Sequence, residues 1–87
     1  MSFTRIGAFV GRSAVRVKIL EDLSKGPKTP TELAYLENEH LSHVSRALAE
    51  LRAQGLVASM PRSSRQKYYR TTQRGYELYA VVMRAAK

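Results

Sequence analysis

The chain has 87 residues, of which 44% are hydrophobic, and its 15 Lys or Arg against 7 Asp or Glu give a net charge of +8. This length suits one domain, and the apolar content is typical of a folded chain rather than a disordered one. Because cysteine is absent, disulfides, thiolate metal sites and cysteine nucleophiles are excluded. No apolar run approaches the roughly 20 residues of a membrane span. No signal-like segment opens the sequence either, so we expect a cytoplasmic protein.

The charge is distributed unevenly along the sequence. Residues 1–30 have a net charge of +4, residues 31–60 of −2 and residues 61–87 of +6. A pI near 10.3 with clustered Lys and Arg favours a polyanionic partner, because cations that neutralise phosphates release condensed counterions. The alternative is a basic surface that only keeps the protein in solution.

The first predicted helix spans residues 14–24. Ser13 is its expected N-cap, and Gly26 and Pro27 end it, since glycine accepts a left-handed conformation and proline cannot continue a helix. Its apolar face consists of Val15, Ile19, Leu20 and Leu23. Residues 1–12 contain an apolar stripe that glycines interrupt, so both a helix and a strand are open there.

A strong signal for a helix start follows. Thr29 is the expected N-cap, Pro30 occupies the first helical position, and Glu32 completes a capping box. The predicted helix is short and covers residues 30–36. The side chains expected to face inward are Leu33, Ala34 and Leu36.

The next predicted helix runs from about residue 40 to residue 54. It follows a turn in which Asn38 is expected to adopt the left-handed conformation, and Gly55 ends it. At about 100° per residue, one apolar face is formed by Leu41, Val44, Ala47, Leu48 and Leu51. The opposite face carries Ser42, Arg46, Ala49 and Ala53, flanked by His43 and Ser45.

A β-hairpin and a last helix complete the predicted order. The strands cover residues 56–60 and 67–71, and the loop between them is basic. Thr72 caps a helix that continues to residue 86 and is apolar around most of its circumference. One side of this helix is expected to pack on the core of the same chain, and the other is available to a second copy of the chain. We therefore predict a homodimer whose interface contains Tyr76, Tyr79, Val82 and Met83.

Two groups of side chains are candidates for contacts with nucleic acid. Arg46 is the best candidate for reading a base, because its guanidinium group matches the O6 and N7 atoms of guanine. Its neighbours on the same helix face are Ser42, His43 and Ser45. The cations of the hairpin, which can bind the phosphate backbone or the minor groove, are Arg62, Arg65 and Lys67. Thr29 and Thr31 can offer N–H and hydroxyl groups to a further phosphate.

Other chemistry has little support. His40 and His43 lie three residues apart with Glu37 before them, but a zinc site needs three or four ligands and no further ligand is evident. Tyr68 and Tyr69 point to opposite faces of a strand, so one is expected to pack on the core. There is no Gly-rich phosphate loop, paired-carboxylate pattern or Ser/His/Asp arrangement. We therefore expect no enzymatic activity, no cofactor and no metal site.

These motifs together resemble a known family. The chain is similar to small archaeal-type winged helix-turn-helix transcriptional regulators near the ArsR and MarR families. The similarity covers about residues 13–80, and its clearest segments are TPTELA (29–34), HLSHVSRALAELRAQGLV (40–57) and KYYRTTQRGYEL (67–78). It implies an α+β fold in one domain, residues 1–87. The helix-turn-helix would cover about 30–54, the β-wing about 56–71 and the dimerisation helix about 73–86.

The resemblance also implies a function. Such proteins bind a pseudo-palindromic operator as homodimers, with the recognition helix in the major groove and the wing on the backbone or in the minor groove. ArsR-type sensing commonly uses cysteines, which this chain lacks, and MarR-type ligand pockets need longer helical arms, so we expect no small-molecule ligand. The alternatives are a low-specificity architectural DNA-binding protein, a protein–protein interaction module and a protein that binds RNA or single-stranded nucleic acid.

Overall fold

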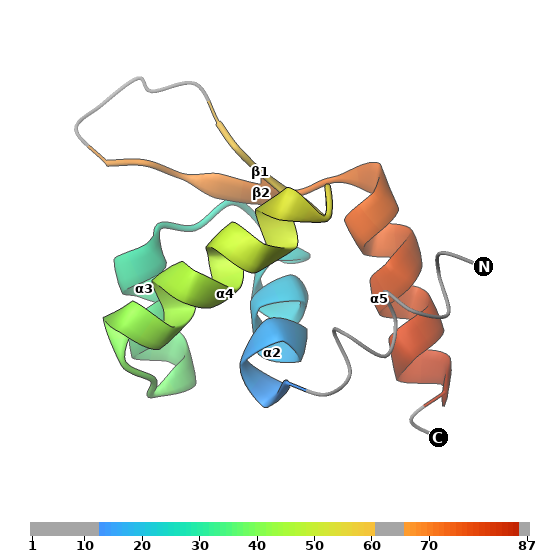
Figure 1. Ribbon diagram of the computed structural model, residues 1–87, viewed down its shortest axis with the longest axis horizontal. Coiled ribbons are helices and arrows are strands. Elements are labelled where there is room, and N and C mark those ends of the chain that lie inside the picture. The colour runs from blue at the N-terminus through green and yellow to red at the C-terminus, as the bar shows by residue number, and fades with distance from the viewer. Residues whose placement is uncertain (1–12, 61–65, 86–87) are drawn as a thin grey trace.

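The computed structural model describes residues 13–60 and 66–85, and Figure 1 shows their arrangement. In chain order the elements are α2 (Ala14–Leu23), α3 (Pro30–Glu37), α4 (Leu41–Ala53), β1 (Val57–Ser59), β2 (Tyr69–Thr71) and α5 (Gln73–Ala85). This is the expected α+β fold class, and each helix lies within one or two residues of its predicted bounds. The expectations for residues 1–12, for Arg62 and Arg65 and for residue 86 lie outside the described residues. No helix in the described ranges is long and apolar enough to cross a membrane.

The helix ends form as the local sequence predicts. Ser13 Oγ accepts a hydrogen bond from the Arg16 backbone N–H at 3.2 Å. At the start of α3, Thr29 Oγ1 accepts from the Glu32 N–H at 3.1 Å, and Glu32 Oε1 accepts from the Thr29 N–H at 2.8 Å. The predicted capping box is therefore complete. Asn38 has φ 51° and ψ 49°, which confirms the left-handed turn between α3 and α4.

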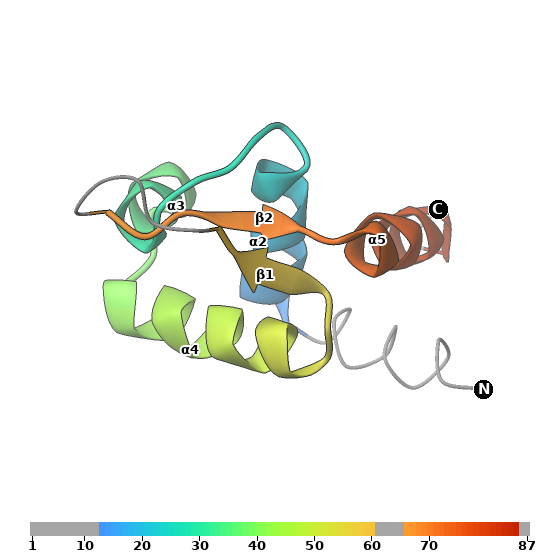
Figure 2. The same ribbon diagram turned by 90° about the horizontal axis from the view of Figure 1, so that it is seen from above.

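The core lies where α2, α3 and α4 meet the hairpin and α5. Figures 1 and 2 place α3 at one end of the molecule and α5 at the other, with α2 between them. Burying one large aliphatic side chain contributes about 1.5–3 kcal/mol, so this cluster is the main source of stability. Its buried members are Ile19, Leu20, Leu23, Leu33, Val44, Ala47, Leu48, Leu51, Leu56, Val57 and Leu78.

Two leucines that were predicted to face the core are exposed, and those two predictions are wrong. The buried or partly buried residues of α3 are Pro30, Leu33, Ala34 and Glu37. Leu36 is 54% exposed because it lies about 110° from the middle of that face around the helix. Leu41 is 49% exposed because it is the first residue of α4, nearly one turn before the first buried position, Val44. In both cases the predicted helix is present, but the surface that packs on the core is smaller than the apolar residues of the helix suggest.

The hairpin strands are shorter than predicted, and they have a partner that the sequence pattern did not reveal. β1 and β2 pair antiparallel, with Val57 opposite Thr71 and Ser59 opposite Tyr69. At the other edge of β2, the Lys28 N–H donates to the Tyr69 carbonyl oxygen at 3.1 Å. The Tyr69 N–H donates back to the Lys28 carbonyl oxygen at 2.9 Å. Because Lys28 directly precedes the cap of α3, this exchange attaches the hairpin to the start of α3.

A tightly packed junction joins α5 to the end of α4. Thr72 Oγ1 accepts from the Gly75 N–H at 3.0 Å, as an N-cap does, and its hydroxyl donates to the Gly55 carbonyl oxygen at 2.7 Å. A Cβ at position 75 would overlap the Leu56 carbonyl oxygen and lie 2.6 Å from Thr71 Cγ2. Glycine is therefore required where α5 approaches the backbone of the hairpin.

Candidate nucleic-acid interface

The outward face of α4 is polar and accessible. The opposite face is anchored in the core by Val44, Ala47, Leu48 and Leu51. Ser42, Ser45 and Arg46 are exposed, as the helical periodicity predicted. The Arg46 side chain forms no hydrogen bond or ion pair with any residue that the structure describes, so its guanidinium group is available to an external partner.

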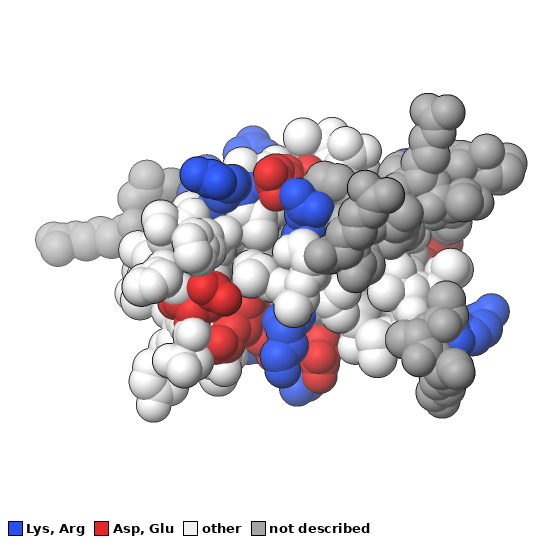
Figure 3. Space-filling model, turned by 60° about the horizontal axis from the view of Figure 1, so that its bottom comes forward, with Lys and Arg blue, Asp and Glu red and all other residues white. Residues whose placement is uncertain are grey.

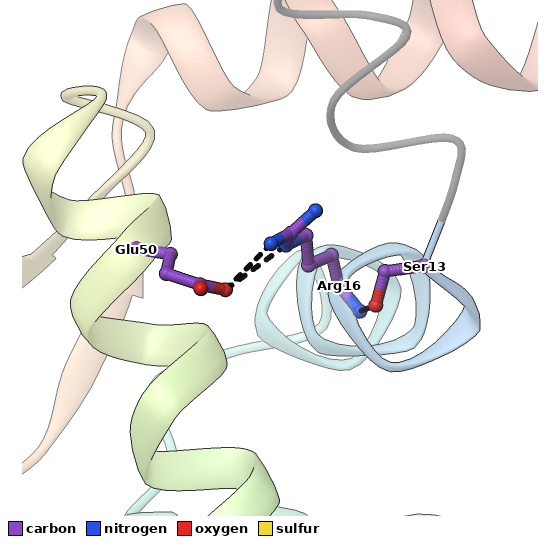
Figure 4. A network of polar contacts seen from close by, with 3 residues as sticks. All are labelled: Ser13, Arg16 and Glu50. Carbon is purple, nitrogen blue, oxygen red and sulfur yellow. Dashed lines mark hydrogen bonds and ion pairs between the residues drawn. The ribbon is translucent and has the colours of Figure 1, made fainter.

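An ion pair joins α4 to α2. Arg16 donates to Glu50 Oε1 from Nη2 at 2.7 Å and from Nε at 3.2 Å, and Ser13 caps the first turn that carries Arg16 (Figure 4). The two side chains are 19% and 38% exposed, so water screens their attraction only in part. The pair neutralises a carboxylate on α4 and opposes rotation of α4 about its own axis. No local sequence signal predicts it, because the partners lie 34 positions apart.

The N-terminus of α4 carries a second carboxylate contact. Glu39 Oε1 lies 2.9 Å from His43 Nδ1 and accepts the His40 backbone N–H at 3.3 Å. The hydrogen bond with His43 is the main reason that the pKa of the Glu39 carboxyl is lowered from its ordinary value. The two histidine rings meet edge to face, with their centroids 5.3 Å apart. His43 is exposed, as predicted, whereas Glu39 was overlooked although its i, i+4 spacing to His43 is a recognisable signal.

The structure describes part of the basic hairpin. Lys67 is exposed, and its Nζ lies 5.4 Å from the centroid of the Tyr69 ring, a cation–π contact. Tyr69 packs against the core, as one of the two adjacent tyrosines was expected to do. The Tyr68 hydroxyl donates to Gln66 Oε1 at 3.3 Å. Arg70 on β2 is a further exposed cation that was not among the predicted contact residues.

The two threonines at the start of α3 differ in accessibility. Thr29 is only 5% exposed, and both its backbone N–H and its hydroxyl oxygen take part in the capping box. Thr31, in the first turn of α3, is exposed. Of the two, Thr31 is therefore the one that a phosphate could reach.

Acidic side chains gather on the underside of the molecule, next to basic ones (Figure 3). The most perturbed carboxyl is Glu37, the last residue of α3. Burial first, and then a hydrogen bond and the charge of Asp22, raise its pKa from 4.5 to about 8. When both carboxyl groups are ionised, neither Glu37 oxygen has a hydrogen-bond donor in the described part of the chain. The hydrogen bond with Asp22 forms only when one of the two carboxyl groups holds a proton. Within the described ranges, no three His, Asp or Glu side chains are placed to hold a metal ion.

The chain contains a helix-turn-helix, formed by α3 and α4, and a β-hairpin with exposed cations follows it. This order of elements defines the class of winged helix-turn-helix proteins. Residues 11–87 match the winged helix-turn-helix family, and the chain belongs to this family. The predicted family resemblance and fold class are thereby confirmed. Members of such families of regulators are generally not enzymes. No curated protein sequence matches the chain at a significant level.

Solved structures of regulators share this fold. The transcriptional regulator BldR from Sulfolobus solfataricus has a TM-score of 0.78 at 23% identity, over 98% of this chain and 68% of its own. The adhesin competence repressor from Streptococcus pyogenes has a TM-score of 0.77 at 22% identity, over 85% of this chain and 56% of its own. ZitR from Lactococcus lactis, a MarR family member solved in complex with DNA, has a TM-score of 0.71 at 20% identity, over 78% of this chain and 48% of its own. The chain thus spans about half to two thirds of the length of these proteins, and identities this low establish the fold alone.

Proposed function

We propose that this protein is a cytoplasmic regulator of transcription that binds double-stranded DNA sequence-specifically as a homodimer. The observation that carries the proposal is the outward face of α4, where Ser42, Ser45 and Arg46 are exposed. In helix-turn-helix proteins the second helix enters the major groove, and its N-terminal residues meet the base edges. The DNA complex of ZitR, a protein with the same fold, supports this proposal.

Arg46 is the proposed base-reading residue. Its guanidinium group has no partner among the described residues, so binding to guanine O6 and N7 would not require an existing ion pair to break. Ser42 and Ser45 are small, and their hydroxyl groups suit either donor or acceptor edges. The Arg16–Glu50 ion pair supports this arrangement, because it restrains the helix that carries these side chains.

The hairpin is the proposed backbone-binding element. The cation–π contact places the ammonium group of Lys67 beside the Tyr69 ring on the hairpin, and the side chain remains exposed to a partner. We propose that Lys67 binds phosphate together with Arg62 and Arg65, which the sequence places in the same loop. Thr31, exposed at the N-terminus of α3, is the proposed contact on that helix.

The second copy of the chain is proposed to pack on α5. Tyr76 and Met83 are 45% and 39% exposed, and with the exposed Ala80 they form one stripe at i, i+4 and i+7 spacing. Two α5 helices that cross antiparallel at the small Ala80 would bring Tyr76 next to Met83 of the partner subunit. Tyr79 and Val82, the other two expected interface residues, are partly buried against the chain's own core, so we place them at the edge of this interface.

A selection of binding sites from random duplex DNA, carried out at two salt concentrations, tests the DNA-binding proposal. We expect an enriched palindrome whose half-sites are centred about 34 Å apart, one turn of DNA. Salt-sensitive binding without a motif would instead identify a low-specificity architectural protein. Absence of any salt-dependent binding would favour a protein–protein interaction module.

Sedimentation equilibrium tests the dimer. We expect the wild-type chain to be a dimer and Ala80→Lys to be a monomer, because the substitution places a charge at the centre of the proposed contact. Val81→Lys is the matched control, since Val81 is 42% exposed but lies about 100° away from Ala80 around the helix. A dimer that survives Ala80→Lys, or is lost in Val81→Lys alone, would contradict the proposed face.

A further inference from the structure

Glu39 directly precedes the N-cap of α4, and its carboxylate contacts the helix that is proposed to read DNA. Its Oε1 atom lies 2.9 Å from His43 Nδ1 and accepts a second hydrogen bond, 3.3 Å long, from the His40 backbone N–H. Two donors from the start of one helix thus converge on one oxygen. The contact holds the His43 ring in one orientation, although 57% of the His43 side chain is exposed.

This contact determines which ring nitrogen of His43 carries the proton. An ionised carboxylate only accepts hydrogen bonds, and the lowered pKa of Glu39 keeps it ionised. A carboxylate oxygen 2.9 Å from a nitrogen without a proton would be repelled, so Nδ1 carries a proton. In the neutral ring Nε2 is then left without one, and it is a hydrogen-bond acceptor.

An acceptor on the recognition helix can distinguish bases in the major groove. Adenine N6 and cytosine N4 are amino groups that donate there, whereas guanine N7 and O6 and thymine O4 only accept. We propose that Glu39 is a specificity-determining positioning residue, which holds His43 in the Nδ1–H tautomer so that Nε2 accepts a hydrogen bond from an adenine or cytosine amino group. This inference rests on the proposed DNA-binding function. It predicts that the protein recognises one further base in each half-site, through His43.

The placement of Glu39 supports a role of this kind. A carboxylate beside a helix that approaches DNA repels the phosphate backbone and lowers affinity. Glu50, the carboxylate within α4, is neutralised by Arg16, whereas Glu39 is paired in the described structure only with groups of His40 and His43. The competing explanation is that Glu39 only complements the positive end of the α4 dipole. That explanation predicts no effect of Glu39 on the choice of base.

The tautomer is measurable in the free protein by ¹⁵N NMR of the neutral His43 ring. We expect the Nδ1–H form in the wild type and in Glu39→Gln, whose amide oxygen still accepts a hydrogen bond. In Glu39→Ala we expect a shift toward the Nε2–H form. Circular dichroism and thermal unfolding confirm that each variant is folded. A wild-type ring that is mainly in the Nε2–H form would overturn the inference whatever the DNA result.

Base preference is measured by selection from random duplexes with the wild type, Glu39→Ala, His43→Ala and the double variant. We expect Glu39→Ala to reduce the preference for adenine or cytosine at one position per half-site by about five-fold, the effect of losing one hydrogen bond of ordinary net strength. In the His43→Ala background, Glu39→Ala should change nothing further at that position. Glu21→Ala is the control, because it removes the same charge from α2 and should keep the wild-type motif.

The outcomes separate this inference from the function on which it rests. A wild-type motif that survives Glu39→Ala unchanged would overturn the role of Glu39 and leave the proposed regulator intact. A change that persists with equal size in the His43→Ala background would show that Glu39 acts through another group, which also overturns the inference. Absence of any motif for the wild type would refute the proposed function and the base-reading role with it.

Discussion

Glu37 creates a pH-dependent weakness where α3 packs on α2, and Glu37→Gln should remove it. The pKa of the Glu37 carboxyl is raised from 4.5 to about 8, chiefly by burial and then by Asp22. The glutamine amide keeps the shape of the side chain and can donate to the Asp22 carboxylate, but it cannot ionise. The variant therefore removes the ionisation and retains the packing.

The sign and size of the effect follow from linkage between protonation and folding. As pH rises above 4.5, the unfolded chain loses the Glu37 proton while the folded chain retains it, so the free energy of unfolding falls until about pH 8 and is then constant. The full difference between the two pKa values corresponds to roughly 5 kcal/mol. Because Glu37 is only partly buried, screening by water reduces this to about 1–2 kcal/mol.

Urea denaturation at pH 5, 7 and 9, followed by circular dichroism, measures the prediction. The difference in free energy of unfolding between Glu37→Gln and the wild type should grow by about 1–2 kcal/mol between pH 5 and pH 9. Glu77→Gln, on the exposed side of α5, removes the same charge but lacks the burial that creates the effect. A difference that does not change with pH, or that decreases, would refute the reasoning.

Three further substitutions test the proposed interface and the fold. Arg46→Ala should cost about 1–3 kcal/mol of binding free energy and relax one base per half-site. Arg52→Ala, at the other end of α4, is the control and should keep the wild-type DNA motif. If Arg46→Ala also kept the motif, Arg46 would not be a base-reading residue. Lys67→Ala should lower the salt slope of binding by about one with no change of motif, and an unaltered slope would exclude a phosphate contact. Gly75→Ala should reduce the free energy of unfolding by roughly 1–3 kcal/mol in urea, because its Cβ meets the Leu56 carbonyl. An unchanged unfolding midpoint would contradict that close approach.

The local structure of this chain follows from short stretches of sequence. The capping box of Thr29 and Glu32 and the left-handed Asn38 depend on residues within one turn of each other, so spacing alone predicts them. The same is true of the exposed face around Arg46, because helical periodicity needs no knowledge of the packing partner. For this reason the sequence predicts the order of elements, the positions of the helix-turn-helix and the hairpin, and most of the proposed DNA-binding face.

The remaining features depend on which distant residues meet, and only the packed chain decides that. The Lys28–Tyr69 backbone pairing and the Arg16–Glu50 ion pair join segments that no local pattern relates. The raised pKa of Glu37 likewise exists because α3 packs against α2, where Asp22 lies. The part of the α3 circumference that meets the core decided that Leu36 is exposed, although its apolar character is the same as that of buried leucines. Apolar periodicity identifies the side of a helix that can be buried, whereas the tertiary arrangement determines how far that burial extends and which charges it brings together.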